Sequence, residues 1–127
     1  MSAAFRATAP LALMGLIFYL SAQSDPGADI GTVGRILAHF GEYALLASLW
    51  AWALAPALGR RAIVAAAAIA FLYALSDEWH QSFVAGRDAD PLDVVIDGVG
   101  IAVVSLALRA RRAGEPELSG IGPTPRN

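Results

Sequence analysis

Hydrophobic residues along the chain gather into four long runs that are separated by short polar stretches. The runs cover about residues 7–22, 36–58, 62–79 and 92–108. A helix needs roughly 20 mostly apolar residues to cross the hydrocarbon core of a membrane, and a backbone in lipid must satisfy its own hydrogen bonds. The pattern therefore predicts an all-α protein, a bundle of four transmembrane helices in the cell membrane. Pro10 lies near the start of the first run, where its missing amide donor costs little.

The two ends of the chain need separate treatment. The first run has an alternative interpretation as a cleaved signal peptide, with Arg6 as its charged start, although "FYLSAQS" is a poor cleavage site. The stretch "AGEPELSGIGPTPRN" is rich in Gly, Pro and Ser, a composition typical of disorder. The sequence thus predicts a membrane domain over residues 1–112 and a disordered cytoplasmic tail over residues 113–127.

Composition agrees with a membrane protein. Of 127 residues, 57% are hydrophobic and 16% are charged, whereas soluble domains carry about 25% charged residues. A net charge of −2 does not provide the basic surface that nucleic-acid binding requires. The chain has no cysteine, which excludes disulfides and thiolate metal sites. Nothing in the composition predicts an oligomeric state.

The positions of the arginines predict the orientation in the membrane. Seven arginines precede the first run, join the second to the third, or follow the fourth, whereas two lie in the other connections. Cytoplasmic segments of membrane proteins carry an excess of Lys and Arg, so both termini are predicted to be cytoplasmic. The seven are Arg6, Arg60, Arg61, Arg109, Arg111, Arg112 and Arg126, and the two are Arg35 and Arg87.

Acidic residues and histidines follow the opposite distribution. Both histidines, and every acid except Glu115 and Glu117, fall at the outer ends of the predicted helices. Arginine count and acid position are separate features of the sequence, and they give the same topology. Charged side chains inside a membrane usually face the bundle interior and pair with another group. We therefore expect a polar site at the outer mouth of the bundle.

Spacing places several of these residues on shared helix faces. His39 and Glu42 are three residues apart and share one face. Asp93 and Asp97 are four apart, and like charges at that spacing repel. A cation is therefore expected near the two aspartates, with Arg87, His80 or a bound metal as its source.

The end of the third run carries a further polar face. Asp77 shares that face with His80 and Gln81, and Glu78 points about 100° away. The helix dipole disfavours acids at a C-terminal end, so nearby partners are expected for Asp77 and Glu78.

Each of these residues also has a purely structural interpretation. His39 could face interfacial water, Glu42 could pair for stability, and Asp93 could be a first-turn acid favoured by the helix dipole. Asp88 and Asp90 are interpreted as a solvated loop. Gly98 forms a small-xxx-small pair with Ala102, a pattern typical of helix packing.

Three motifs, "HFGEYALL", "SDEWHQSFVAGR" and "DVVIDGVG", resemble those of the VanZ-like family in order and spacing. The resemblance spans about residues 21–106, and "SAQSDPG" is similar to the family's Ser/Gln/Pro stretch. The family comprises small bacterial membrane proteins, and its founding member is linked to teicoplanin resistance. In that family a proline is frequent at Ala85 and an asparagine at Asp97. The resemblance implies the following site residues: Ser21, Gln23, His39, Glu42, Tyr43, Asp77, Glu78, His80, Gln81, Arg87, Asp93 and Asp97.

Three functions fit these residues. The first is binding of an envelope lipid or a lipid-linked cell-wall precursor, with Arg87 contacting phosphate. The second is a metal-assisted enzyme acting on a lipid-linked substrate, with Glu42 or Glu78 as general base and a divalent metal as cofactor. Its candidate ligands are His39, Asp77, His80, Asp93 and Asp97. The third, an ion pathway, is disfavoured because the cytoplasmic halves of the runs offer no polar relay. The sequence does not decide whether the protein is an enzyme.

Overall fold

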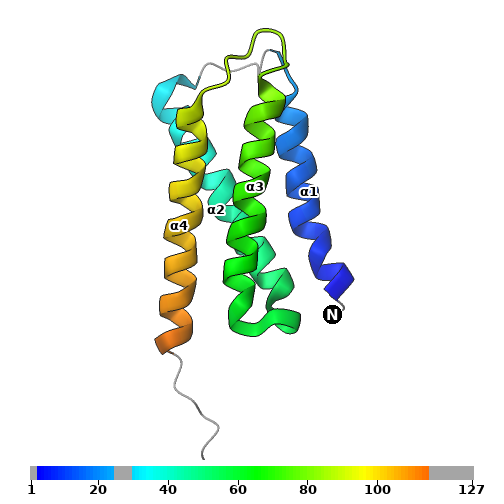
Figure 1. Cartoon of the computed structure of the whole chain (residues 1–127), viewed down its shortest axis with the longest axis vertical. Helices are drawn as coiled ribbons and strands as arrows, with labels where there is room; N and C mark the ends of the chain where they lie inside the picture. The colour runs from blue at the N-terminus through cyan, green and yellow to red at the C-terminus, as the bar shows by residue number, and fades with distance from the viewer. Residues whose placement is uncertain (1–2, 25–29, 115–127) are drawn as a thin grey trace, which may run out of the picture.

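The computed structural model describes residues 3–24 and 30–114, and within these ranges the chain is helical and contains no strand. The elements are α1 (Ala3–Ser21), α2 (Gly31–Leu58), the short 3-10 helix η1 (Gly59–Arg61), α3 (Ala62–Gln81) and α4 (Pro91–Gly114). The α-helices lie side by side along one long axis (Figure 1). The all-α prediction is thus confirmed.

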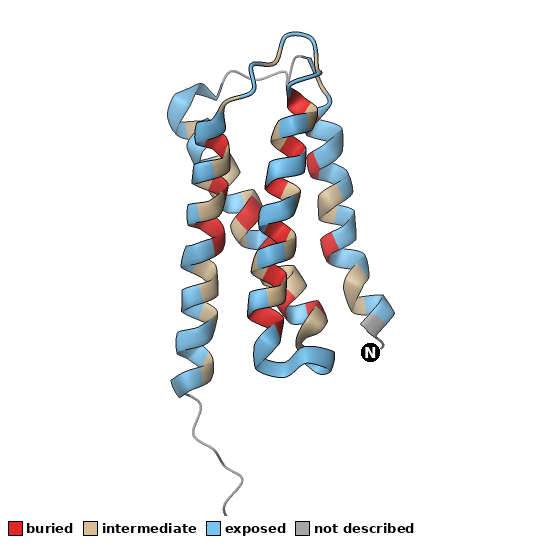
Figure 2. Ribbon diagram, viewed as in Figure 1, coloured by how far each residue is buried: buried red, intermediate tan, exposed pale blue. Residues whose placement is uncertain are grey.

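Three segments of the described chain are long and apolar enough to cross a membrane: Ala4–Ser21, Gly31–Gln81 and Pro91–Gly114. The middle segment comprises α2, η1 and α3, and the chain reverses direction at η1 (Figure 1). Gly59 ends α2 with a positive φ of 54°, a backbone conformation that glycine adopts without steric cost. Buried positions face inward, and large apolar side chains remain exposed on the outer faces (Figure 2).

Two groups of helix ends define the two ends of the molecule. The ends of α1 and α3 lie beside the starts of α2 and α4 (Figure 1), and we call this the acidic end. The start of α1, η1 and the last turns of α4 lie at the opposite end (Figure 1), which we call the arginine end. It carries Arg6, Arg60, Arg61, Arg109, Arg111 and Arg112.

Small residues let α3 approach α2 closely. Ala62, Ala66, Ala70 and Ala74 are all buried, and their spacing of four places them on one stripe of the helix. The stripe packs against α2, which contributes its own core residues, Tyr43 and Leu46 among them. Tyr73 extends this packing to α1, because its hydroxyl donates a hydrogen bond of 2.6 Å to the Met14 carbonyl.

α4 approaches the backbone of α2 closely at Gly100, a position that the small-xxx-small pattern at Gly98 did not indicate. A Cβ at Gly100 would lie 2.4 Å from the Phe40 carbonyl oxygen. A Cβ at Gly98 would meet only the Phe71 ring, at 3.5 Å. Gly100 therefore faces the backbone of α2 and Gly98 faces Phe71 of α3, a register that spacing along α4 does not reveal.

Helix boundaries differ from the sequence prediction in three places. α1 begins at Ala3, so Pro10 lies inside the helix and not near its start. α2 begins at Gly31, one and a half turns before the predicted residue 36. α4 continues to Gly114, so the predicted tail boundary at residue 113 falls within the helix, and residues 115–127 lie outside the described chain.

Candidate functional site

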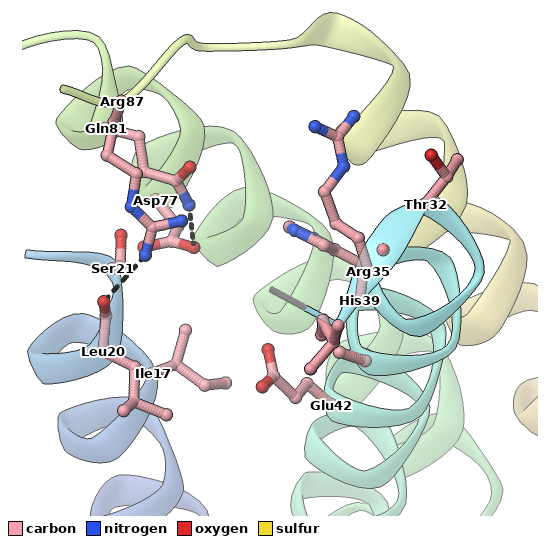
Figure 3. Close-up of a pocket in the computed structure, with 13 residues that line it drawn as sticks. Ile17, Leu20, Ser21, Thr32, Arg35, His39, Glu42, Asp77, Gln81 and Arg87 are labelled. Carbon is pink, nitrogen blue, oxygen red and sulfur yellow. Dashed lines mark hydrogen bonds between the residues drawn. The ribbon is translucent and has the colours of Figure 1, made fainter. Parts of the chain in front are cut away.

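A cavity of about 880 Å³ opens at the acidic end between α1, α2 and α3 (Figure 3). Its wall on α1 is formed by Ile17, Leu20 and Ser21. The facing walls on α2 and α3 are largely polar, and Arg87 from the loop after α3 closes one side (Figure 3). The cavity therefore combines an apolar side with a charged one.

The wall on α2 is one face of that helix. Arg35, His39 and Glu42 line the cavity, and their spacings of four and three residues align them along the helix. The Glu42 side chain projects into the space between α2 and α1 (Figure 3). None of the described residues donates a hydrogen bond to Glu42 or forms an ion pair with it. Its carboxylate is therefore an acceptor available to a ligand.

The wall on α3 continues the alanine stripe outward with polar residues. Asp77 and Gln81 are buried on the face that begins at Ala62. Oδ2 of Asp77 accepts hydrogen bonds from the Tyr43 hydroxyl and the Gln81 Nε2, each 3.3 Å long. Oδ1 of Asp77 is buried and has no hydrogen-bond partner. Tyr43 and Gln81 thus hold the carboxylate in place and leave one oxygen unsatisfied.

Arg87 joins the loop after α3 to the end of α1. Its Nε donates to the Gln23 carbonyl at 3.0 Å, and its Nη2 donates to the Leu20 carbonyl at 2.9 Å. Such carbonyls at a helix C-terminus have no partner within the helix, so this arginine stabilises the end of α1. Ser21 lies beside these contacts, and its buried hydroxyl has no hydrogen-bond partner.

Behind the α2 wall, His39 lies between two aspartates of α4. Its Nδ1 is 2.9 Å from Oδ1 of Asp97, and its Nε2 is 3.4 Å from Oδ2 of Asp93. Both aspartates are 3% exposed. The Arg35 Nη2 lies 3.2 Å from Oδ1 of Asp93, near enough for an ion pair although it makes no hydrogen bond there. The expected cation near these aspartates is therefore Arg35, beside the His39 ring, and Arg87 and His80 make their contacts with α1.

Asp90, interpreted from the sequence as part of a solvated loop, instead caps α4. Its Oδ1 accepts the Leu92 amide at 3.0 Å, and Pro91 occupies the first helical position, as is common at helix starts. Its Oδ2 accepts the Arg35 Nη2 at 2.7 Å. The Leu92 amide and then the Arg35 guanidinium lower the pKa of Asp90 below its usual range.

The twelve site residues implied by the resemblance divide into two groups. Ser21, His39, Glu42, Asp77, Gln81 and Arg87 line the cavity. The others do not, although Tyr43, Asp93 and Asp97 contact residues that do. Gln23 uses its side chain locally, donating from Nε2 to the Tyr19 carbonyl at 3.0 Å.

His80 and Glu78 also lie outside the cavity wall. The His80 ring stacks on Phe18 with centroids 4.5 Å apart, and its Nδ1 is buried without a hydrogen-bond partner. Glu78 likewise has one buried carboxylate oxygen, Oε1, without a partner. His80 therefore helps to pack α3 against α1, which spacing along α3 alone did not indicate.

The site predicted from the sequence lacked several residues that line the cavity, namely Arg35, Thr32 and the apolar residues of α1. Arg35 precedes His39 by four residues, so helical spacing could have identified it. The apolar wall carries no such signal, because Ile17 and Leu20 resemble any other lipid-facing residues of the first run.

The candidate metal ligands do not gather at one point. Among the described residues, no group of three or more His, Asp and Glu side chains is placed to hold a metal ion. Both ring nitrogens of His39 already face carboxylates. Asp77 lies on the α3 wall of the cavity and is held by Tyr43 and Gln81, and His80 stacks on Phe18 outside the cavity. The arrangement around His39 is thus an ion-pair network.

These features define an all-helical membrane protein with a polar cavity at one end of its helices. A family model described as VanZ/LLP1 matches residues 7–112, and the chain belongs to this family. The resemblance found in the sequence is thereby confirmed. No curated protein and no solved structure matches the chain.

Proposed function

We propose that this protein binds the polar headgroup of an envelope lipid, or of a lipid-linked cell-wall precursor, in the cavity at the acidic end. The carrying observation is the cavity of about 880 Å³, which is lined by apolar side chains of α1 and by two residues with unsatisfied polar atoms, Ser21 at the end of α1 and Asp77 on α3. A lipid-linked molecule presents this combination, because an acyl or prenyl chain adjoins its charged headgroup.

The unsatisfied atoms suggest how the headgroup is held. Oδ1 of Asp77 and the Ser21 hydroxyl are buried without partners, and leaving such groups unpaired costs about 1–3 kcal/mol each. Headgroup hydroxyls or amines would donate to Asp77 and Glu42. Arg87 retains its Nη1 group for a phosphate, since its hydrogen bonds to the end of α1 use only Nε and Nη2.

The same proposal includes a membrane topology. In it, α1, α2, α3 and α4 each cross the membrane, and the arginine end faces the cytoplasm. The cavity then opens at the outer leaflet, where cell-wall precursors are displayed and glycopeptides act. Occupancy of the cavity would contribute to resistance against drugs of the teicoplanin type.

The test compares Glu42→Gln and Asp77→Asn with Asp88→Asn, which removes an exposed acid at the same end outside the cavity. Purified protein in nanodiscs is titrated with a short-chain phospholipid and with a lipid-linked disaccharide precursor. We expect each cavity variant to weaken binding about tenfold and Asp88→Asn to match the unmodified protein. Equal affinities in all three variants would reject the cavity as the binding site.

A cellular assay completes this test. Cells expressing each variant at equal membrane levels are challenged with teicoplanin. We expect the minimum inhibitory concentration to fall to that of cells without the protein for the two cavity variants only. Lipid binding with no change in drug susceptibility would separate the binding activity from resistance and overturn the resistance role.

A further inference from the structure

A second cavity lies at the arginine end, far from the site described above. It has a volume of about 550 Å³ and lies between η1, the start of α3 and the last turns of α4. Four arginines line it: Arg60, Arg61, Arg109 and Arg112. We propose that this cavity binds the phosphate of an anionic phospholipid in the leaflet at the arginine end.

The charges around this cavity lack a counter-charge in the described chain. The described acids all lie on the other half of the bundle, and none of them forms an ion pair with Arg60, Arg61 or Arg109. Like charges held around a small space repel one another, more strongly beside lipid than in water. A bound anion would relieve that repulsion, and guanidinium groups match phosphate in geometry and charge.

Two structural features give the site a fixed shape. The Arg112 Nη1 donates to the Gly59 carbonyl at 2.9 Å, which ties the end of α4 to the start of η1. No side chain caps the start of α3 at Arg61, so the positive end of that helix dipole adds to the potential in the cavity. The arginines are therefore presented around a shaped cavity and not scattered over a surface.

The apolar part of the lining favours a lipid over free phosphate. Ile63 and Val64 lie in the first turn of α3 and form part of the cavity wall. Ile63 is buried, whereas Val64 is 54% exposed. A soluble phosphate gains nothing from the Val64 side chain, whereas the glycerol and upper acyl carbons of a phospholipid would cover it. Basic pockets between helices on the cytoplasmic side of membrane proteins are suited to such headgroups.

The test uses a matched pair of arginines two residues apart on α4. Arg109 lines the cavity and Arg111 does not, while both are exposed. Delipidated protein in detergent is titrated with phosphatidylglycerol, phosphatidylcholine and inorganic phosphate, and bound lipid is counted by native mass spectrometry. We expect Arg109→Gln to weaken phosphatidylglycerol binding about fivefold, Arg60→Gln with Arg109→Gln about 25-fold, and Arg111→Gln less than twofold.

The other arms separate the competing explanations. Phosphatidylcholine should bind at least about tenfold more weakly than phosphatidylglycerol. Asp88→Asn, which changes an exposed residue that lines neither cavity, should leave phosphatidylglycerol binding unchanged. Equal losses in Arg109→Gln and Arg111→Gln would overturn the proposal, because they would indicate diffuse surface charge. Inorganic phosphate binding as tightly as the lipid would overturn it too. Unfolding temperatures within the error of the unmodified protein would confirm that the variants are folded.

Discussion

His39 lies between two carboxylates of α4. Its two ring nitrogens face Asp93 and Asp97, and the side chains of these aspartates are only 5% and 4% exposed. If one partner of a buried ion pair is removed, the other charge stays buried without compensation. The resulting loss in the free energy of unfolding is larger than the net contribution of the intact pair. The three residues therefore tie α2 to α4 beside the cavity.

We expect His39→Ala to lower the free energy of unfolding by about 3 kcal/mol. Asp97→Asn alone should cost less, since an asparagine oxygen can still accept from His39. The double variant His39→Ala with Asp97→Asn should lose less than the sum of the two, because one stranded charge is removed with its partner. Denaturant unfolding of the purified protein in lipid measures the free energy of unfolding of the three variants. Strictly additive losses would contradict an energetic coupling between His39 and Asp97.

Two kinds of helix contact hold α3 and α4 against α2. α3 approaches α2 through its stripe of buried alanines, and α4 approaches α2 through Gly100. Both depend on the absence of bulk, which favours close helix packing in membranes. On α3, the polar wall of the cavity consists of Asp77 and Gln81, which continue the same alanine stripe.

Gly100→Ala should disrupt the packing of α4 on α2, because its Cβ would lie 2.4 Å from the Phe40 carbonyl oxygen. We expect a loss of about 1–3 kcal/mol of unfolding free energy, the usual cost of overpacking. Gly98→Ala is the matched control, since its Cβ would make an ordinary contact at 3.5 Å. Similar melting temperatures for the two variants would contradict this account of the interface.

The cap of α4 should respond to acid. The pKa of Asp90 is lowered by the Leu92 amide and the Arg35 guanidinium, so its stabilising contribution is present above the ordinary value of 3.8 and is lost as the pH falls through the folded value. Asp90→Asn should therefore lower the melting temperature at neutral pH. The difference from the unmodified protein should vanish in acid below the folded pKa, and a difference independent of pH would contradict this role.

For the whole molecule, the distribution of charge predicts the orientation in the membrane. Every described acid lies toward the acidic end, and six described arginines lie at the other end. The chain has no cysteine, so single cysteines can report the side of the membrane without interference. We expect Asp88→Cys to react with an impermeant maleimide in intact cells. Arg111→Cys should react only after permeabilisation, and labelling of both in intact cells would contradict the four-crossing topology.

The sequence was sufficient to predict the class of the protein and the approximate position of each helix. Four apolar runs, the arginine bias and the polar motifs sufficed for an all-α membrane protein of this family, because lipid forces each long apolar run into a self-bonded helix. Periodicity also placed His39 with Glu42, and Asp77 with Gln81, on the faces that line the cavity. These are local properties, fixed within one or two helical turns.

The contacts between residues of different helices became known from the three-dimensional structure. Asp93 and Asp97 pair with His39 and Arg35 of α2, while His80 turns to Phe18 on α1. Partners more than 50 residues apart are set by the rotation and depth of each helix against its neighbours. Those are fixed by small residues such as Gly100, which leave no periodic signal. The physical reason is that packing across helices depends on shape at the contact, and spacing along one helix does not encode it.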